Sequence, residues 1–434
     1  MSVLGQTGNM SRLPALKGES SGAWGALVSA CAAWTFDAMD LQIFTLILFP
    51  SVSELIGSEN PGVVAYTGGI IVAWKLAAVG IGGVAFGIVA DRIGRARTMI
   101  ATVLIYSVFT GLSGFAQSLW QLAILQALAG IGIGGEWAAG AALIAESWPE
   151  RTRARVLVVM QMCFAAGFFL AAVINLIIGP TGWRYVFIAG AAPAVITLFV
   201  RLFVQEPSRW LAVRDQRLSG TCRGVADNVF ATFLSLFSPG TRRRTMVGLL
   251  TATPMMIGAF AGATLLPVWV RDLVGADPRL AVAATSQFFM LMNAGGVAGY
   301  LALIWLNDVV GRRWSYFLMA IGCAAANLFM FTQITTTAGL FRFAPIYGFF
   351  VLGGFGTFAV YLPELFCTRN RATGQGFCWN AARILTAAGP VATGAIVNAL
   401  GSAPAAGAMM TAIYIVGFVA IWFGPETKGA LLQD

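Results

Sequence analysis

Twelve apolar segments recur along the chain, and each is long enough to cross the roughly 30 Å hydrocarbon core of a bilayer as a helix. Of the 434 residues, 58% are hydrophobic and only 10% are charged, whereas about a quarter of the residues of a soluble protein are charged. The sequence therefore predicts an all-α membrane protein. The expected spans are 23–49, 63–90, 98–116, 119–146, 155–178, 183–204, 245–270, 280–306, 314–333, 340–366, 372–399 and 404–424.

The basic residues gather in alternate loops. Clusters of arginine follow spans two, four, six, eight and ten, as in "DRIGRAR", whereas the first loop, "SVSELIGSENPG", contains no Lys or Arg. Because cytoplasmic loops carry the excess of Lys and Arg, we expect both termini and the central loop in the cytoplasm. The net charge of +9 is explained by this topology rather than by nucleic-acid binding.

The two halves of the chain repeat each other. The pattern D-x-x-G-R occurs at 91–95 and again at 308–312, and E-x4-R-x-R-A occurs at 146–154 and again at 364–372. A duplicated six-span unit is typical of transporters that rock one half against the other around a central site. The predicted organisation is a cytoplasmic tail (1–22), a six-helix bundle (23–204), a cytoplasmic loop (205–244), a pseudo-symmetric six-helix bundle (245–424) and a second tail (425–434).

The motifs resemble those of the major facilitator superfamily. "GIVADRIGRAR" at 87–97 matches its G-x-x-x-D-R-x-G-R-x-R signature, and "EPSRWL", "YLPELFCTRNRATG" and "PETKG" are similar to the sugar and metabolite branch. The segment 132–156, "GIGGEWAAGAALIAESWPERTRARV", is most similar to the sialate, aromatic-acid and metabolite:H+ symporters. The resemblance implies the major facilitator fold, a gating role for the first-half signature and a coupling role for acids of the first span.

Three acids lie deep in the predicted spans: Asp37, Asp40 and Glu136. Burial disfavours the charged form of a carboxylic acid, so that protonation can switch its charge. With no histidine in the chain, carboxylates are the expected proton carriers near neutral pH. We predict a proton-coupling role for all three. The alternatives are a helix-terminus acid or a partner for a buried base.

Arg383 is expected about 18 Å into the eleventh span, with Asn380 one turn earlier. A permanent cation at this depth needs an anion, which comes either from the substrate or from a fixed ion pair with Asp37 or Glu136. We also predict substrate contacts for Tyr361, Trp379, Gln161 and Lys75. Lys75 could instead extend its long stem to the interface, and the aromatic residues could serve packing alone.

Charged and glycine residues gather at the predicted cytoplasmic mouth. Exposed ion pairs contribute little to stability, so we predict that this set closes the inner mouth in one state and separates in the other. A plain topological anchor is the alternative. The predicted gate residues are Gly87, Asp91, Arg92, Gly94, Arg95, Glu146, Arg151, Arg153, Asp308, Glu364, Arg369 and Arg371.

These features predict a proton-coupled symporter that imports a small organic anion by alternating access across a bacterial cytoplasmic membrane. We expect it to work as a monomer in the lipid bilayer, without a cofactor, a metal or nucleic acid. A neutral sugar or polyol:H+ symporter is the nearest alternative, and a drug:H+ antiporter a more distant one. A membrane enzyme is disfavoured by the absence of histidine, of a cysteine cluster and of a catalytic-triad pattern. A receptor would need a larger soluble domain than the central loop provides.

Overall fold

The computed structural model describes residues 19–191, 205–218, 229–274, 278–387 and 402–430, together with positions 396, 399–400 and 432. Throughout these ranges the regular secondary structure is helical. Long helices suit this sequence because every backbone hydrogen bond within the membrane must be satisfied inside the segment itself.

In the described part of the first half the chain forms six helices, joined by short turns. Pro50 lies inside the first of them, which runs seven residues beyond the predicted end of its span at position 49. The helices are α1 (Glu19–Ile56), α2 (Pro61–Ile93), α3 (Arg95–Ser113), α4 (Leu119–Ser147), α5 (Glu150–Ile178) and α6 (Trp183–Ala189), with a 3-10 turn at Gly179–Thr181.

The central segment is partly helical and leads into the second half. It contains α8 (Ser208–Leu218), α9 (Val229–Leu234) and a 3-10 turn at Ser235–Phe237. The second half comprises α10 (Arg242–Val274), α11 (Pro278–Val310), α12 (Arg312–Gln333), α13 (Thr337–Leu365), α14 (Arg371–Ala387), α16 (Ala403–Met410) and α17 (Tyr414–Ala420), with 3-10 turns at Thr411–Ile413 and Ile421–Phe423.

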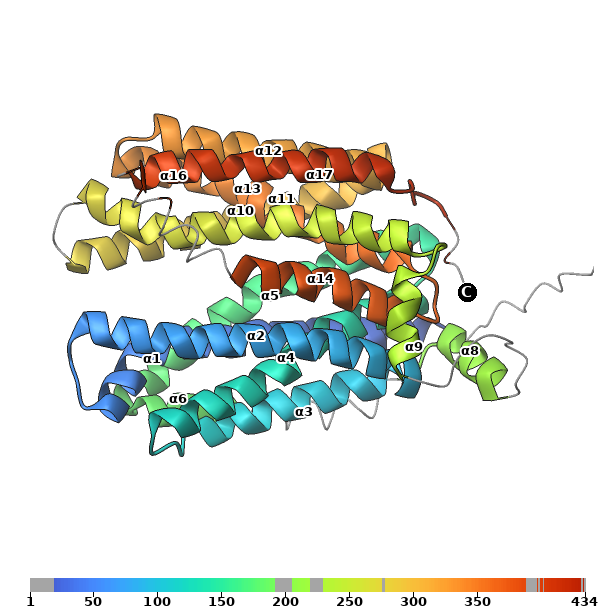
Figure 1. Ribbon diagram of the computed structural model, residues 1–434, viewed down its shortest axis with the longest axis horizontal. Helices are drawn as coiled ribbons and strands as arrows, with labels where there is room; N and C mark the ends of the chain where they lie inside the picture. The colour runs from blue at the N-terminus through green and yellow to red at the C-terminus, as the bar shows by residue number, and fades with distance from the viewer. Residues whose placement is uncertain are drawn as a thin grey trace, which may run out of the picture.

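Helices of each half pack mainly on one another. In Figure 1 the helices α1, α2, α3, α4 and α6 lie below, and α10 to α13, α16 and α17 lie above. The halves meet where α14 packs on α2 and α4, and where α5 packs on α11 and α13. Helices α8 and α9 and the C-terminus lie at one end of the helices, which we call the loop end.

The outer surface is apolar, as a lipid-facing surface must be. Trp120, Phe169 and Leu176 are exposed by 68%, 73% and 77%. Within the described ranges, nine helices are long and apolar enough to cross a membrane. The predicted spans 183–204, 245–270 and 372–399 are absent from this set, and all three contain positions for which the structure describes no backbone or no side chain.

Two glycines and two glutamates shape the loop end. Gly94 and Gly311 precede α3 and α12 with φ angles of +122° and +86°, a region that side chains with a Cβ rarely adopt. Glu206 accepts hydrogen bonds from the backbone N–H groups of Arg95 and Arg97 at 2.8 and 3.1 Å. Glu426 does the same for α12, accepting from Arg312 N at 2.9 Å. Each carboxylate therefore satisfies N–H groups at a helix N-terminus that lack an intrahelical partner.

Candidate functional site: a cross-half gate and a buried charged centre

A first cluster of buried charges joins the halves at the loop end. Glu146 of α4 accepts from Arg95 of α3 at 3.0 Å and from Arg371 of α14 at 2.7 Å. Asp91 of α2 pairs with Arg95 at 2.9 Å and accepts from the backbone N–H and the hydroxyl of Thr373 at 2.8 and 2.6 Å. Arg371 and Thr373 belong to the second half, so these bonds hold the two halves together.

A second cluster repeats the first with the halves exchanged. Glu364 of α13 accepts from Arg312 of α12 at 3.1 Å and from Arg153 of α5 at 3.1 Å. Asp308 of α11 pairs with Arg155 of α5 at 2.7 Å. In each half, therefore, one glutamate binds an arginine of its own half and one of the other, which is the pseudo-symmetry that the repeated motifs predicted.

The remaining predicted gate residues differ in their surroundings. Gly87 lies against α14, where a Cβ would approach the carbonyl oxygen of Ala372 to 2.7 Å, so glycine permits the close cross-half contact. Arg92 donates to Thr232 of α9 at 3.3 Å. Arg369 is half-buried. Arg151 is exposed and shows no ion pair in the described part of the chain, so the structure does not bring it into either cluster.

Four loop-end residues were missed by sequence reasoning: Arg155, Glu206, Arg312 and Glu426. Arg312 is the last residue of the repeated D-x-x-G-R pattern, so the repeat itself was a sufficient signal. Glu206 is the first residue of the quoted "EPSRWL" segment, and Glu426 is the second residue of "PETKG". Their capping role depends on a fold that brings both segments back to the starts of α3 and α12.

Asp37 and Glu136 are buried acids without hydrogen-bond partners. Both side chains have 0% exposure, and none of their four carboxylate oxygens finds a partner among the described residues. The two acids lie close enough for their charges to interact. An unpaired polar group in such surroundings lowers the stability of the fold. Its presence therefore indicates a functional role, such as the exchange of protons.

Aromatic side chains that lie one and three residues from these acids in the sequence, Trp137 and Trp34, belong to a cluster that bridges the halves. Trp137 of α4 stacks on Trp379 of α14, with ring centres 4.4 Å apart and planes inclined by 15°. Trp137 donates through Nε1 to Gln161 at 2.9 Å, which fixes the orientation of its indole ring. Trp34 of α1 lies next to Trp137, at 6.4 Å between ring centres. The structure thus brings Trp379 and Gln161 together at Trp137, the residue that follows Glu136.

Arg383 and Asn380 approach this region from α14. The Arg383 guanidinium lies 5.9 Å from the centre of the Trp379 ring and forms no ion pair within 4.0 Å among the described residues. Its charge and that of Asp37 are close enough to attract. Asn380 is buried against Gly83 of α2, donates to Gly376 O at 2.9 Å and leaves its Oδ1 atom without a partner in the same ranges.

Asp40 and Lys75 form a buried ion pair, and the charges of both interact with Asp37. Lys75 Nζ lies 2.9 Å from Asp40 Oδ2 and 2.9 Å from Gln126 Oε1, and Thr110 donates to the other Asp40 oxygen. Lys75 is only 3% exposed, so the alternative that its stem reaches the interface is wrong. For Asp40, the alternative of a partner for a buried base describes the structure.

Tyr361 lies away from the buried centre. Its hydroxyl donates to Pro425 O at 3.0 Å, at the loop end, and the side chain is fully buried. The structure therefore does not bring Tyr361 together with the other predicted substrate residues. Tyr361 lies four residues before the end of α13, where its side chain contacts the C-terminal segment instead.

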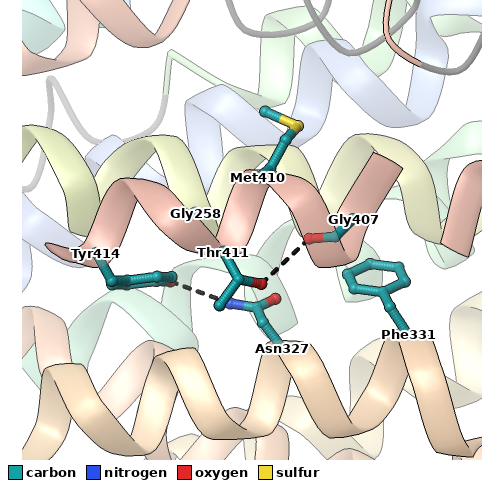
Figure 2. Close-up of a pocket in the computed structure, with 7 residues that line it drawn as sticks. All are labelled: Gly258, Asn327, Phe331, Gly407, Met410, Thr411 and Tyr414. Carbon is teal, nitrogen blue, oxygen red and sulfur yellow. Dashed lines mark hydrogen bonds between the residues drawn. The ribbon is translucent and has the colours of Figure 1, made fainter. Parts of the chain in front are cut away.

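The second half encloses a small pocket of its own (Figure 2). Asn327 donates to the hydroxyl of Tyr414 at 3.2 Å and accepts from Tyr347 at 3.1 Å, and Thr411 donates to Gly407 O at 3.2 Å. Its lining comes from α10, α12, α16, α17 and the turn between α16 and α17, so the pocket lies within one half rather than between the halves. In the described ranges, no group of three or more Cys, Asp or Glu side chains could hold a metal ion.

Comparison with known proteins agrees with this architecture. Residues 26–377 match the family model of the Major Facilitator Superfamily. A Haemophilus influenzae protein named for metabolite transport is 30% identical and covers 94% of this chain and 98% of its own length. A Cupriavidus pinatubonensis protein named for 4-methylmuconolactone transport is also 30% identical, with coverage of 93% and 91%.

A solved structure shows the same fold. The proton:xylose symporter XylE, bound to 6-bromo-6-deoxy-D-glucose, superposes with a TM-score of 0.75 over 95% of this chain and 98% of its own, at 19% identity. The predicted fold class is thereby confirmed. The chain is an integral membrane transporter rather than an enzyme, and it belongs to the major facilitator superfamily, in the branch of aromatic-acid, sialate and metabolite transporters.

Proposed function

We propose that this protein is a symporter that carries a small organic anion into the cell together with protons. The observation that supports this most strongly is that a buried acid without a hydrogen-bond partner, Asp37, lies near a cation, Arg383, that forms no ion pair in the described ranges. The relative named for 4-methylmuconolactone transport supports a small organic metabolite as substrate. We further propose a bacterial inner membrane, cytoplasmic termini and a functional monomer.

The proposed cycle begins with the loop end closed by the two glutamate–arginine clusters. Substrate enters from the opposite end, and a proton neutralises Asp37, which releases Arg383 from its attraction to that acid. A guanidinium offers a carboxylate two parallel N–H donors, so Arg383 can bind the substrate anion. With both charges balanced, the halves rock, the cross-half bonds of Glu146 and Glu364 break, and substrate and proton leave into the cytoplasm.

The nearest alternative is symport of a neutral sugar or polyol. In that case Arg383 would serve only as the electrostatic partner of Asp37, and its removal would affect coupling rather than the choice of substrate. The two functions can be separated by a panel of probes: benzoate, nicotinate, gluconate and N-acetylneuraminate as carboxylates, and xylose and inositol as neutral compounds.

Arg383→Gln is expected to raise the KM for the transported carboxylate by roughly ten- to a hundredfold. A hydrogen bond to a charged group contributes about 1.5–3 kcal/mol, and this variant removes the charge while keeping a polar side chain. Uptake of the panel into proteoliposomes measures the effect. Arg383→Lys keeps the charge but loses the planar fork, so its KM should lie between those of the unmodified protein and of Arg383→Gln.

A matched control is Arg184→Gln, which removes an arginine from a half-exposed pair with Glu54 elsewhere in the molecule. We expect its KM to equal that of the unmodified protein. Efficient uptake of xylose or inositol, with carboxylate uptake absent, would contradict the proposed anion specificity.

A further inference from the structure

The buried centre contains more acid than its basic groups neutralise. This inference rests on the proton-coupled anion transport proposed above and concerns its stoichiometry. Asp40 and Lys75 neutralise each other at 2.9 Å. The charges that remain at this depth in the described ranges are those of Asp37, Glu136 and Arg383. Two acids therefore face one base, before any substrate is bound.

Glu136 lies between α1, α4 and α5, on the side of the centre that faces the loop end. A Cβ at position 140 would lie 3.2 Å from Glu136 Oε1, close to Ala30 of α1 and Met160 of α5. The side chain therefore extends one turn along α4 toward the loop end, over a glycine. The titratable groups that face it are Asp37 and Cys31 of α1 and Tyr106 of α3, and none of them is a base.

Binding of a substrate anion decides how many protons the centre must hold. If a monocarboxylate takes Arg383 as its counter-ion, the base left near Asp37 in the described ranges is Lys75, which is already paired with Asp40, and Glu136 has no basic partner there. An uncompensated ion in a closed, dehydrated site costs several kcal/mol. The loaded and closed state is electrically balanced only when both acids carry a proton.

We infer that Glu136 is a second proton carrier, so that each monoanion enters together with two protons, one on Asp37 and one on Glu136. When the loop end opens, water reaches Glu136 over Gly140, and its proton leaves toward the cytoplasm. Asp37 releases its own proton as it regains the attraction of Arg383. Two protons and one monoanion move inward, and the cycle carries a net charge of +1.

Electrogenic transport follows from this stoichiometry. For one net charge, a membrane potential of 100 mV, negative inside, favours accumulation by roughly fiftyfold. A pH gradient of one unit acts on both protons and favours accumulation by about a hundredfold. A one-to-one symport of a monoanion would be electroneutral, would show no effect of the potential, and would gain only about tenfold from the same pH gradient.

The test measures the proton-to-substrate ratio in proteoliposomes, from the pH gradient that exactly balances a set substrate gradient, at several imposed potentials. The probe is the monocarboxylate among benzoate, nicotinate, gluconate and N-acetylneuraminate that the unmodified protein transports fastest. We expect a ratio of two and stimulation by an inside-negative potential. For Glu136→Gln we expect a ratio of one and loss of that stimulation, with pH-driven uptake retained.

Each outcome decides a separate question. A ratio of one in the unmodified protein overturns the inference without any variant, as does a ratio of two that persists in Glu136→Gln, because Glu136 would then keep its proton throughout the cycle. Proton-driven uptake would still support the proposed function in both cases. Absence of uptake for all four carboxylates contradicts the proposed function itself. Glu54→Gln, which removes an acid from the half-exposed pair with Arg184, should retain a ratio of two.

Discussion

Asp37→Asn is expected to abolish accumulation of the anion under a membrane potential imposed without a pH gradient, while exchange of labelled for unlabelled substrate continues. Asparagine has nearly the shape of a protonated aspartate but cannot release a proton, so the site is held in its loaded form. Accumulation ratios should fall from about fiftyfold or more under a 100 mV potential to about one. Counterflow, which needs no net proton movement, should remain within a few-fold of that of the unmodified protein.

The measurement is paired uptake and counterflow in the same proteoliposome preparation. Asp37→Glu retains a titratable group and should recover part of the accumulation, so it separates loss of the proton site from general damage. If Asp37→Asn accumulates substrate as the unmodified protein does, Asp37 carries no coupled proton. If both activities vanish in a well-folded variant, its role lies in substrate binding instead.

Lys75→Met is expected to lower the free energy of unfolding by about 3–5 kcal/mol. The change leaves Asp40 as an unpaired acid inside the first half, and breaking a buried pair by removing one partner has effects of this size. Thr110 and Gln126 would lose the geometry that the ion pair holds, because both bond to Asp40 or Lys75. Thermal unfolding in detergent measures the change.

The double variant Lys75→Met, Asp40→Asn should recover most of the lost stability, because no buried charge is then left unpaired. The ion pair of Glu54 and Arg184, 2.5 Å apart, is half-exposed and serves as the comparison. Glu54→Gln should lower the free energy of unfolding by less than about 1 kcal/mol. If Lys75→Met and Glu54→Gln lowered the free energy of unfolding equally, the buried pair would contribute no more to stability than the half-exposed one.

Much of the fold followed from the sequence because its signals are local. Apolar length, alternate basic loops and the repeated D-x-x-G-R and E-x4-R-x-R-A patterns each depend on a short stretch of chain. The partner of Glu146 across the halves, Arg371, was present in the second copy of the same pattern. The repeat therefore contained the contact, although no spacing along the chain could give its geometry.

The centre of the molecule was harder to predict because it depends on which neighbour each side chain meets. Asp37 and Asp40 lie three residues apart on one helix, yet only Asp40 reaches Lys75 of α2. Tyr361 lies on a helix of the second half but meets the C-terminal segment at Pro425. Depth along a helix can be counted from the sequence, whereas the direction of a side chain and its partner on another helix cannot.

The most direct test of anion:proton symport is uptake of the carboxylate panel by the unmodified protein in proteoliposomes with an imposed pH gradient, acidic outside. We predict that at least one carboxylate rises above its external concentration while the gradient lasts, and that a protonophore abolishes this rise. Accumulation that is indifferent to the pH gradient, or that occurs only for xylose or inositol, would contradict the proposal.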